Sequence, residues 1–470
     1  MTATSDSGVF DVIVIGAGAV GENVAARAVR GGLTAALVEH ELVGGECSYW
    51  ACMPSKALLR PGHALAAARR LPGVPVGDHL DAAKVLARRT YFTSNWDDAG
   101  QLEWADGAGI TVIRGKARLD GERRVVVGDR TLTASQAVAV CTGSVPVIPP
   151  LEGIADTRVW TSRDATSAKE VPGRLIVLGG GVVGVELAQA WRRLGSEVDL
   201  VITSELPLPR LEPIAGELVA EGLREDGIRI HAGAKAVRVS RDGDGEISLG
   251  LSDGTVLKAD ELLVATGRRP ATESVGVETV GLKPGDTLHV DDSGQVSGVD
   301  GQWLYAAGDV TGRALLTHQG KYAARVVGDV IAARAKGPVE TPPWSQYTAT
   351  ADHACVPAVV FTDPEVASIG LTAAQAAAAG IDTRVVDLDI AVAGSSVHAD
   401  GYRGKARMVV DEQRKVLVGV TFVGQDVAEL LHSATVAIVG EVPLHRLWHA
   451  VPSYPTISEV WLRLLEAYGL

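Results

Sequence analysis

Residues 12–21 of the chain read VIVIGAGAVG. The apolar run Val12–Ile15 leads into the three glycines of a GxGxxG pattern, Gly16, Gly18 and Gly21. In such a turn the first glycine permits the tight bend, the second lets backbone approach a pyrophosphate, and the third lets the helix pack on the strand. A helix is expected over residues 22–30 and a second strand over 35–38, ending on Glu39, which is placed to bind a ribose. The stretch predicts a dinucleotide-binding Rossmann fold.

The same pattern recurs at residues 175–184, LIVLGGGVVG, with the glycines Gly179, Gly181 and Gly184. A helix is expected over 185–194 and the next strand over 198–202, so the chain is predicted to bind two dinucleotides. Ile202 stands where the first copy has Glu39, followed by Thr203 and Ser204. Without a carboxylate there is no repulsion against a 2′-phosphate, which favours NADPH over NADH. No arginine stands at position 203 or 204 to bind that phosphate, and Arg210 is the candidate for this role.

Two cysteines, Cys47 and Cys52, follow the first fingerprint in the run GGECSYWACMPSK, residues 44–56. In an ideal helix their Cα atoms would stand roughly 7.5 Å apart, beyond the usual disulfide reach of about 7 Å. A disulfide here therefore requires the backbone to bend, and strained disulfides are easily reduced. Two buried thiols acting as small apolar side chains are the alternative. Zinc is disfavoured because Cys141 and Cys355 stand alone.

Composition limits the class of protein. The chain has 470 residues, 46% hydrophobic content and a formal charge of −13, which predicts a globular protein of about three domains. This charge argues against nucleic acid or an anionic membrane as partners, so a small-molecule substrate is expected. The N-terminus has no basic segment followed by an apolar core, and no long uncharged apolar run occurs. A cytoplasmic location is therefore expected, and a reducing cytosol favours a catalytic disulfide over a structural one.

Further short motifs lie between and after the two fingerprints. Two strands end in Thr-Gly, at Thr142-Gly143 and at Thr266-Gly267, as in segments that join nucleotide domains. The stretch WLYAAGDV places Gly308 and Asp309 after a strand, and a helix is expected to open at Thr317 and His318. The N-terminus of such a helix could face an anionic ring.

Taken in order, these motifs resemble the class I pyridine nucleotide-disulfide oxidoreductases, which include dihydrolipoamide dehydrogenase, glutathione reductase and mercuric reductase. The resemblance implies an α/β fold with two Rossmann-like domains and a C-terminal α+β dimerisation domain. The FAD domain would cover residues 1–150 and 270–343, the NAD(P) domain 151–269 and the dimerisation domain 344–470. A homodimer with active sites shared across the interface is also implied.

The resemblance implies a role for each matched residue. Cys52 would be the thiol nearer the flavin and Cys47 the thiol that attacks substrate. Lys56 would lie beside the flavin with Glu186 as its ion partner, and Asp309 would hold the FAD ribitol. The other expected FAD contacts are Gly16, Gly18, Gly21, Glu39, Gly45, Thr142, Gly143, Gly308, Thr317 and His318. Those expected for the nicotinamide cofactor are Gly179, Gly181, Gly184, Thr203, Ser204 and Gly267.

The chain departs from the family near its C-terminus. Where disulfide reductases of the family have a His-Pro-Thr-x-Ser-Glu motif, this chain reads YPTISE, from Tyr454 to Glu459. A phenol, with an ordinary pKa near 10, is a poor base at neutral pH, although it can protonate a leaving thiolate. His445 or His449 could supply a displaced base.

Three functions remain open from the sequence. The first is an FAD-dependent NAD(P)H:disulfide oxidoreductase that acts on a small disulfide, with Tyr454 and Glu459 of the partner chain completing each site. The second is reduction of a quinone or metal ion, with dihydrolipoamide dehydrogenase-type activity as a further variant. Mercury is disfavoured because no vicinal cysteine pair occurs near the C-terminus. The third is a flavoprotein scaffold or redox sensor whose dithiol state changes its partners.

Tyr49 and Trp50, between the cysteines, are bulky. They either narrow access to Cys47, stack on an aromatic substrate, or serve packing.

Overall fold

The computed structural model describes residues 8–243 and 245–470. The backbone forms two compact units. The first contains Met1–Met53, Thr90–Pro146 and Arg268–His353, and the second contains Pro54–Arg89, Val147–Gly267 and Ala354–Leu470. The second unit holds most of the predicted nicotinamide domain and most of the predicted dimerisation domain, while residues 268–269 and 344–353 of these predicted domains lie in the first unit. The division into three domains stays a prediction.

The first unit is built on a seven-stranded sheet. Its order is β3-β2-β1-β6-β5-β4, and β16 pairs with β6. Pairing is parallel among β3, β2, β1, β6 and β16, and antiparallel between β6, β5 and β4. The strands are β1 (Val9–Ile15), β2 (Ala35–Glu39), β3 (Thr111–Arg114), β4 (Ala117–Leu119), β5 (Arg124–Val127), β6 (Arg130–Val140) and β16 (Leu304–Ala306). Every residue of β2 is buried, as expected for an inner strand of a parallel sheet.

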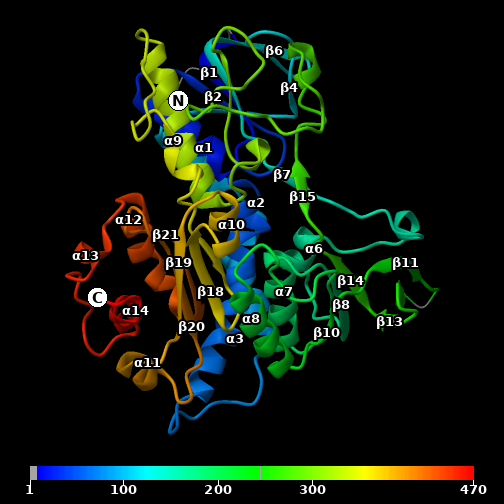
Figure 1. The fold of residues 1–470 in the computed structure, drawn as a ribbon. Helices are drawn as coiled ribbons and strands as arrows, with labels where there is room; N and C mark the ends of the chain where they lie inside the picture. Colours follow the sequence, from blue (N-terminus) through cyan, green and yellow to red (C-terminus); the bar gives the residue numbers. More distant parts are fainter. Residues whose placement is uncertain (1–7, 244) are drawn as a thin grey trace. The chain divides into compact units, whose positions relative to one another are not determined.

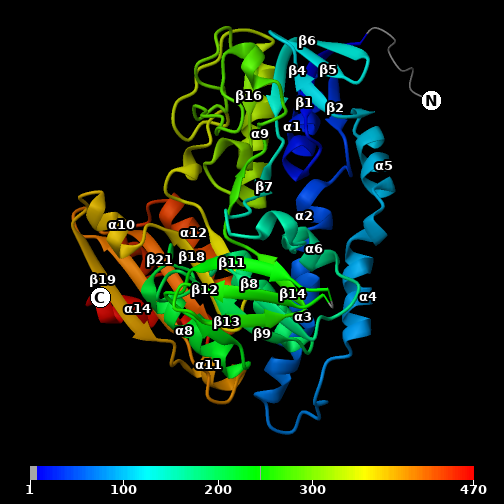
Figure 2. The ribbon, with the colours of Figure 1, turned by 90° about the vertical axis from the view of Figure 1, so that its right-hand side faces the viewer.

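Helices of the first unit cover this sheet. Helices α1 (Ala19–Arg30) and α9 (Thr317–Arg334) pack side by side (Figure 1, Figure 2), with α5 (Ala99–Gly107) beside β3. The short pieces are α2 (Gly45–Tyr49), η1 (Ser94–Trp96), η3 (Val277–Val280), η4 (Asp309–Thr311) and η5 (Thr350–Asp352), and β7 (Ser144–Pro146) pairs antiparallel with β15 (Arg268–Pro270). The first predicted helix begins at Ala19 rather than Glu22, because Gly18 is already its N-cap and the third glycine lies inside the first turn.

The second unit contains three sheets. A parallel sheet has the order β10-β9-β8-β14, and its strands β9, β8 and β14 are seen together in Figure 2. The strands are β8 (Arg174–Leu178), β9 (Glu197–Val201), β10 (Arg229–His231) and β14 (Glu261–Val264), beside an antiparallel sheet of β11 (Ala236–Arg241), β12 (Ile247–Leu251) and β13 (Val256–Ala259). The helices are α6 (Ser162–Ser167), α7 (Val182–Arg193), α8 (Pro213–Glu225) and η2 (Ile154–Asp156). As in the first copy, α7 begins earlier than predicted, and β9 ends at Val201.

The C-terminal part of the second unit is an antiparallel five-stranded sheet of order β17-β18-β21-β20-β19. Its strands are β17 (Ala358–Val360), β18 (Glu365–Gly370), β19 (Thr383–Asp389), β20 (Lys405–Asp411) and β21 (Val416–Gly424). Helices α12 (Leu431–Val439) and α14 (Val460–Tyr468) pack on it (Figure 1). The remaining elements are α10 (Ala373–Ala378), α11 (Ala393–His398), α13 (Leu444–Leu447), η6 (Val427–Leu430) and η7 (Ile457–Glu459).

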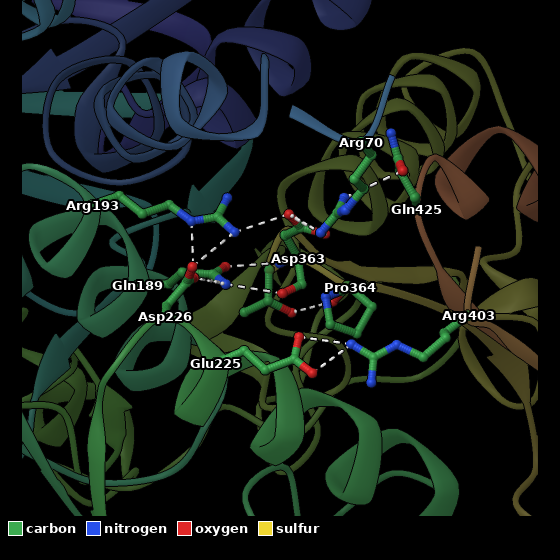
Figure 3. Close-up of polar contacts among 10 residues, drawn as sticks. Arg70, Gln189, Arg193, Glu225, Asp226, Asp363, Pro364, Arg403 and Gln425 are labelled. Atoms are coloured by element: carbon green, nitrogen blue, oxygen red, sulfur yellow. Dashed lines mark hydrogen bonds and ion pairs between the residues drawn. The ribbon is translucent and has the colours of Figure 1, made fainter. Parts of the chain in front are cut away.

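Two longer helices, α3 (Cys52–Arg69) and α4 (Ala82–Phe92), connect segments of the two units. Within the second unit an ion network holds the end of α3 to α7 (Figure 3). Asp363 accepts hydrogen bonds from Arg70 at 2.9 Å and from Arg193 at 2.9 Å. Gln189 bonds the Asp363 backbone at both its N–H and its carbonyl, at 2.7 and 2.9 Å. Among the described residues, no helix is both long and apolar enough to span a membrane.

Candidate active site

The turn between β1 and α1 leaves no room for side chains at two of its glycines. Gly16 has a φ of +99°, and a Cβ there would stand 2.5 Å from the Cys141 carbonyl oxygen. A Cβ on Gly21 would stand 1.9 Å from the Gly16 carbonyl oxygen. Gly18 meets no such contact, since the nearest atom, Gly45 Cα, is 3.9 Å away. The first and third glycines are therefore required by the protein itself, while the second leaves open backbone for a ligand.

Glu39 ends β2 beside this turn. Its side chain is 8% exposed, and it accepts hydrogen bonds from the Ala17 and Glu41 backbone N–H groups at 2.8 Å each. A bridge between Gly18 and Gly44 joins the start of α1 to the start of α2, and a Cβ on Gly45 would meet Gly18 Cα at 2.7 Å. The predicted cofactor residues of this stretch are thus brought together at one edge of the sheet.

A polar chain crosses the first unit at the Thr-Gly segment. The Arg268 Nε donates to Ser144 Oγ at 2.7 Å, and Ser144 Oγ donates to Asp309 Oδ2 at 2.6 Å. Gly308, before Asp309, has a φ of +82°, and Gly143 has a φ of +71°, both in the left-handed region that favours glycine. Ser144 and Arg268 were not predicted, although each directly follows a predicted residue, Gly143 or Gly267. Their position next to these motifs was the available signal.

These residues fit FAD. Thr142 Oγ1 is buried and has no hydrogen-bond partner within the described residues. A buried hydroxyl without a partner costs about 1–3 kcal/mol, so a ligand oxygen at this place would stabilise the protein. The open backbone at Gly18 and the acidic Glu39 match a pyrophosphate and a ribose. Bound at this cradle, the flavin supplies two-electron chemistry between a hydride donor and a disulfide.

The two cysteines flank a break between helices. Cys47 lies inside α2, and Cys52 is the first residue of α3. Between them Trp50 has a φ of −134°, outside the helical region, so the backbone has the bend that the sequence requires of a disulfide here. Cys52 Sγ lies 3.2 Å from Thr317 Oγ1, at the first turn of α9. The sequence predicts Thr317 as a cofactor contact, and the structure shows that it also contacts the Cys52 thiol. His318, the next predicted contact, is exposed on α9.

The reduced pair holds its protons unequally. The hydrogen bond with Cys52, burial and the charge of Cys52 together raise the pKa of Cys47, against smaller opposing effects of Thr317 and Lys321. At the same time the N-terminus of α3 favours a thiolate at Cys52. The arrangement favours a thiolate at Cys52 and a thiol at Cys47 at neutral pH.

Tyr49, between the cysteines, serves packing. Its side chain is 1% exposed, and its hydroxyl donates to the Val43 carbonyl at 3.1 Å and to Gln101 Oε1 at 3.0 Å. Trp96 Nε1 donates to the Tyr49 carbonyl at 3.1 Å, where α2 ends. Trp50 packs edge-on to Tyr49, with ring centroids 5.7 Å apart. The packing alternative is therefore supported for Tyr49. Narrowed access to Cys47 stays a prediction.

Lys56 and Glu186 form an ion pair inside the second unit. Lys56 Nζ lies 2.7 Å from Glu186 Oε2, and Glu186 is 3% exposed. The Phe361 N–H donates to Glu186 Oε1 at 2.9 Å, and Lys56 Nζ lies 4.8 Å from the centroid of the Phe361 ring. The implied pairing is thus present, and the role of the pair beside a flavin stays a prediction.

The second glycine turn repeats the geometry of the first. A Cβ on Gly179 would stand 2.4 Å from the Ala265 carbonyl oxygen, and one on Gly184 would stand 1.9 Å from the Gly179 carbonyl oxygen. Gly181 again faces open space. Ile202 is 1% exposed and fills the space that a Cβ on Gly180 would need.

The other residues predicted for the nicotinamide cofactor lie near the ends of this sheet's strands. Thr203 is exposed after β9, while the Ser204 hydroxyl donates to the Leu206 carbonyl at 2.7 Å. The Gly267 carbonyl, after β14, accepts from the Val147 N–H at 2.9 Å. Contact of these three residues with the cofactor stays a prediction.

Tyr454 and Glu459 lie in the second unit. The Tyr454 side chain is 76% exposed. Glu459 is 7% exposed, its Oε1 accepts from Arg463 at 3.0 Å, and its Oε2 has no hydrogen-bond partner within the described residues. Their placement against Cys47 of a partner chain stays a prediction.

Comparison with known proteins agrees with this site. Residues 10–337 match the family described as pyridine nucleotide-disulphide oxidoreductase, and residues 356–464 match its dimerisation domain. A dihydrolipoyl dehydrogenase of Thermus scotoductus is 34% identical over 470 residues, 97% of each chain. A mercuric reductase of Lysinibacillus sphaericus is 30% identical over 457 residues, 96% of this chain and 81% of the relative.

Among solved structures, the Cu(II) complex of the HOCl-induced flavoprotein disulfide reductase RclA from Escherichia coli matches with a TM-score of 0.83 and 27% identity, covering 97% of this chain and 99% of that one. The predicted fold class and the FAD and NAD(P)H requirement are confirmed, and the dimerisation domain implies a homodimer. The chain belongs to the pyridine nucleotide-disulphide oxidoreductase family, as an FAD-dependent NAD(P)H:disulfide oxidoreductase.

Proposed function

We propose that this enzyme reduces a small disulfide, with Cys47 as the attacking thiol and Cys52 as the thiol next to the flavin. One observation carries the proposal: the helix break that puts Cys47 inside α2 and Cys52 at the start of α3, against Thr317. Cys52 then holds the thiolate and Cys47 carries the exchange with substrate. Lys56 and Glu186 are proposed to lie beside the flavin, with Asp309 on its ribitol.

Tyr454 and Glu459 of the partner subunit are proposed to complete each site of the homodimer. The exposure of Tyr454 and the hydrogen-bond capacity left at Glu459 Oε2 support a contact outside the single chain. A phenol donates a hydrogen bond to a departing thiolate but does not store a proton at neutral pH. Because an acidic leaving thiol departs faster, disulfides with acidic leaving thiols should be preferred.

A series of disulfides tests this preference. The wild type should show a kcat/KM that falls steeply from dithiobis(nitrobenzoate), whose leaving thiol is acidic, to glutathione disulfide and lipoamide. Tyr454→His should raise the rates with the two aliphatic substrates by about tenfold or more, as general acid–base catalysis does. Equal rates along the series in the wild type would contradict the lack of a group that stores a proton at this site.

The thiol roles are tested by substitution. Cys47→Ser should abolish disulfide reduction and spare reduction of the flavin by NADPH, whereas Cys355→Ser, a substitution at a buried cysteine in the second unit, should leave both unchanged. Disulfide reduction that survives Cys47→Ser would overturn the proposal.

We also propose NADPH as the electron donor, because Ile202 places no carboxylate against a 2′-phosphate. A cytoplasmic location is proposed as well. A lower KM for NADPH than for NADH would support NADPH as the donor.

Metal-ion reduction is the second candidate. It is favoured by the relatives named mercuric reductase and by the solved Cu(II) complex of RclA. Thiolates bind soft metal ions, so the same cysteine pair suits both substrates. Faster NADPH oxidation with Cu(II) or Hg(II) than with any disulfide of the series would favour this candidate.

A further inference from the structure

Glu46 stands at the centre of the break between the two cysteines. It directly precedes Cys47 in α2. Its carbonyl accepts hydrogen bonds from the Trp50 N–H at 2.8 Å and from the Ala51 N–H at 2.6 Å, and Ala51 directly precedes Cys52. Glu46 is therefore joined to the chain beside each cysteine, so its position helps to set the geometry of the break.

The Glu46 side chain forms an ion pair that the site described above does not use. Glu46 Oε2 lies 3.6 Å from Arg268 Nη2. The Glu46 side chain is 30% exposed and that of Arg268 is 23% exposed, so the pair is partly buried and less screened by salt than a surface pair. Arg268 begins β15, and both residues belong to the first unit. The pair thus joins the helix that carries Cys47 to a strand far from it in the sequence.

Arg268 is a rigid partner for Glu46. Its Nε donates to Ser144 Oγ at 2.7 Å, and its Nη2 donates to the Ser144 carbonyl at 2.6 Å. Strand β15 pairs with β7, and the Ser144 hydroxyl donates in turn to Asp309 Oδ2 at 2.6 Å. A planar guanidinium that is fixed by two hydrogen bonds loses little further side-chain freedom when it pairs with a carboxylate. Glu46 is therefore anchored to a fixed point of the first unit.

The break brings the two cysteines within reach of each other. In an uninterrupted helix the Cα atoms of Cys47 and Cys52 would stand roughly 7.5 Å apart, beyond the usual disulfide reach of about 7 Å. Trp96 holds the end of α2, and Arg268 holds its start through Glu46. A break that is fixed at both ends keeps each thiol at a high effective concentration for the other, which favours the disulfide and speeds its formation.

We propose that Arg268 is a positioning residue of the redox pair: by holding Glu46 it keeps Cys47 and Cys52 in the geometry that forms their disulfide. The inference deepens the proposed disulfide reduction and rests on it. Once Cys47 has released its proton to solvent, its thiolate attacks one sulfur of the substrate disulfide, forms a mixed disulfide and expels the first substrate thiolate. The Cys52 thiolate then attacks the Cys47 sulfur, forms the Cys47–Cys52 bond and expels the second substrate thiolate. Two electrons pass from the cysteine pair to the substrate, and Arg268 acts on the second step.

The first test measures the redox equilibrium of the cysteine pair in the holoenzyme. The enzyme is equilibrated with glutathione and glutathione disulfide at fixed pH, and the dithiol fraction is measured by mass spectrometry after alkylation. Arg268→Met and Glu46→Gln should each shift the equilibrium toward the dithiol by about tenfold, or about 30 mV for this two-electron couple. Because both substitutions remove the same ion pair, the double variant should shift no further than the larger single shift. Arg118→Met and Glu278→Gln, which remove an exposed ion pair of the first unit at 3.2 Å, are the matched controls and should leave the equilibrium unchanged.

A single turnover supplies a second readout. The holoenzyme, reduced with one equivalent of NADPH, is mixed with one equivalent of dithiobis(nitrobenzoate), and the released thiolate is followed by its absorbance. The wild type should release both thiolates in one phase, whereas Arg268→Met and Glu46→Gln should release the second about tenfold more slowly than the first, because closure of the pair has become slow. Substitutions that only destabilise the fold would not separate the two thiolates. Shifts of opposite sign in the two variants, as their charges alone would give, additive shifts in the double variant, or release of both thiolates in one phase would overturn the inference.

If Arg268→Met does not retain FAD, the Glu46→Gln and Arg268→Lys variants decide. Glu46→Gln must shift the equilibrium toward the dithiol. Arg268→Lys keeps the charge but loses the planar group that Ser144 fixes, so it must shift the equilibrium in the same direction, and any other result overturns the inference. Failure of the underlying function is seen separately, because disulfide turnover that persists in Cys47→Ser would overturn that function whatever the redox equilibria show.

Discussion

Replacing Asp363 with asparagine should destabilise the second unit, because Asp363 is the shared anion of two arginines (Figure 3). Asp363 is 8% exposed and the Arg193 side chain 12%, so their pair is buried, and breaking a buried pair costs about 3–5 kcal/mol. Arg70 is 35% exposed, so its share is discounted for screening by solvent. Asp226 also accepts a hydrogen bond from Arg193, at 2.8 Å, and so compensates part of the Arg193 charge in the variant. We therefore expect the lower end, about 3 kcal/mol.

Thermal unfolding of the holoenzyme, followed by circular dichroism, measures this loss. At about 2–4 °C per kcal/mol the variant should melt roughly 6–12 °C below the wild type at neutral pH. Asp382→Asn, at an exposed aspartate of the same unit, should change stability by less than about 0.5 kcal/mol. An Asp363→Asn variant that melts with this control would refute the reasoning.

The pH dependence of the difference gives a second check. Burial opposes ionisation of Asp363, but the charges of Arg193 and Arg70 outweigh it, and the pKa is lowered. A carboxylate with a lowered pKa contributes stability above its unfolded pKa of about 3.9 and loses it as the pH falls through the folded value. The gap between wild type and Asp363→Asn should therefore be constant at neutral pH and narrow below about pH 4.

Three further substitutions in the first unit have defined outcomes. Gly21→Ala puts a Cβ 1.9 Å from the Gly16 carbonyl oxygen, so the purified protein should lack bound flavin, as read from its visible absorbance. Trp96→Phe removes the hydrogen bond to the Tyr49 carbonyl where α2 ends, and should shift the redox potential of the cysteine pair, measured by equilibration with glutathione, while FAD content stays unchanged. Ser94→Gly places glycine at a φ of +49°, relieves about 1 kcal/mol of backbone strain and should raise the melting temperature; a lower one would contradict the strain.

Local sequence patterns were enough to predict the two glycine turns and the helix break. Each feature depends on steric contacts within a few residues of the chain. The GxGxxG spacing therefore predicts the glycine turns, and the sequence separation of Cys47 and Cys52 predicts the bend that a disulfide between them requires. Helix starts were placed too late because the third glycine was taken as the boundary, whereas Gly18 and Gly181 are the N-caps.

Contacts between distant segments were not predictable in this way. The chain of Arg268, Ser144 and Asp309 forms because β7 pairs with β15 and β16 pairs with β6, and no local pattern encodes that pairing. Glu22 lies in the first turn of α1, and only the packing of α1 against α2 and α9 shows that its Oε1 is buried.

The same steric restriction applies at both glycine turns, and it limits which positions can change when cofactor preference evolves. Because a Cβ at Gly21 or Gly184 would stand 1.9 Å from a carbonyl oxygen, neither position can vary without losing the turn. Changes of nucleotide preference that leave both turns intact must therefore fall outside them, as at Glu39 in the first copy and at Ile202 to Ser204 or Arg210 in the second. A change of electron donor would involve the second copy alone.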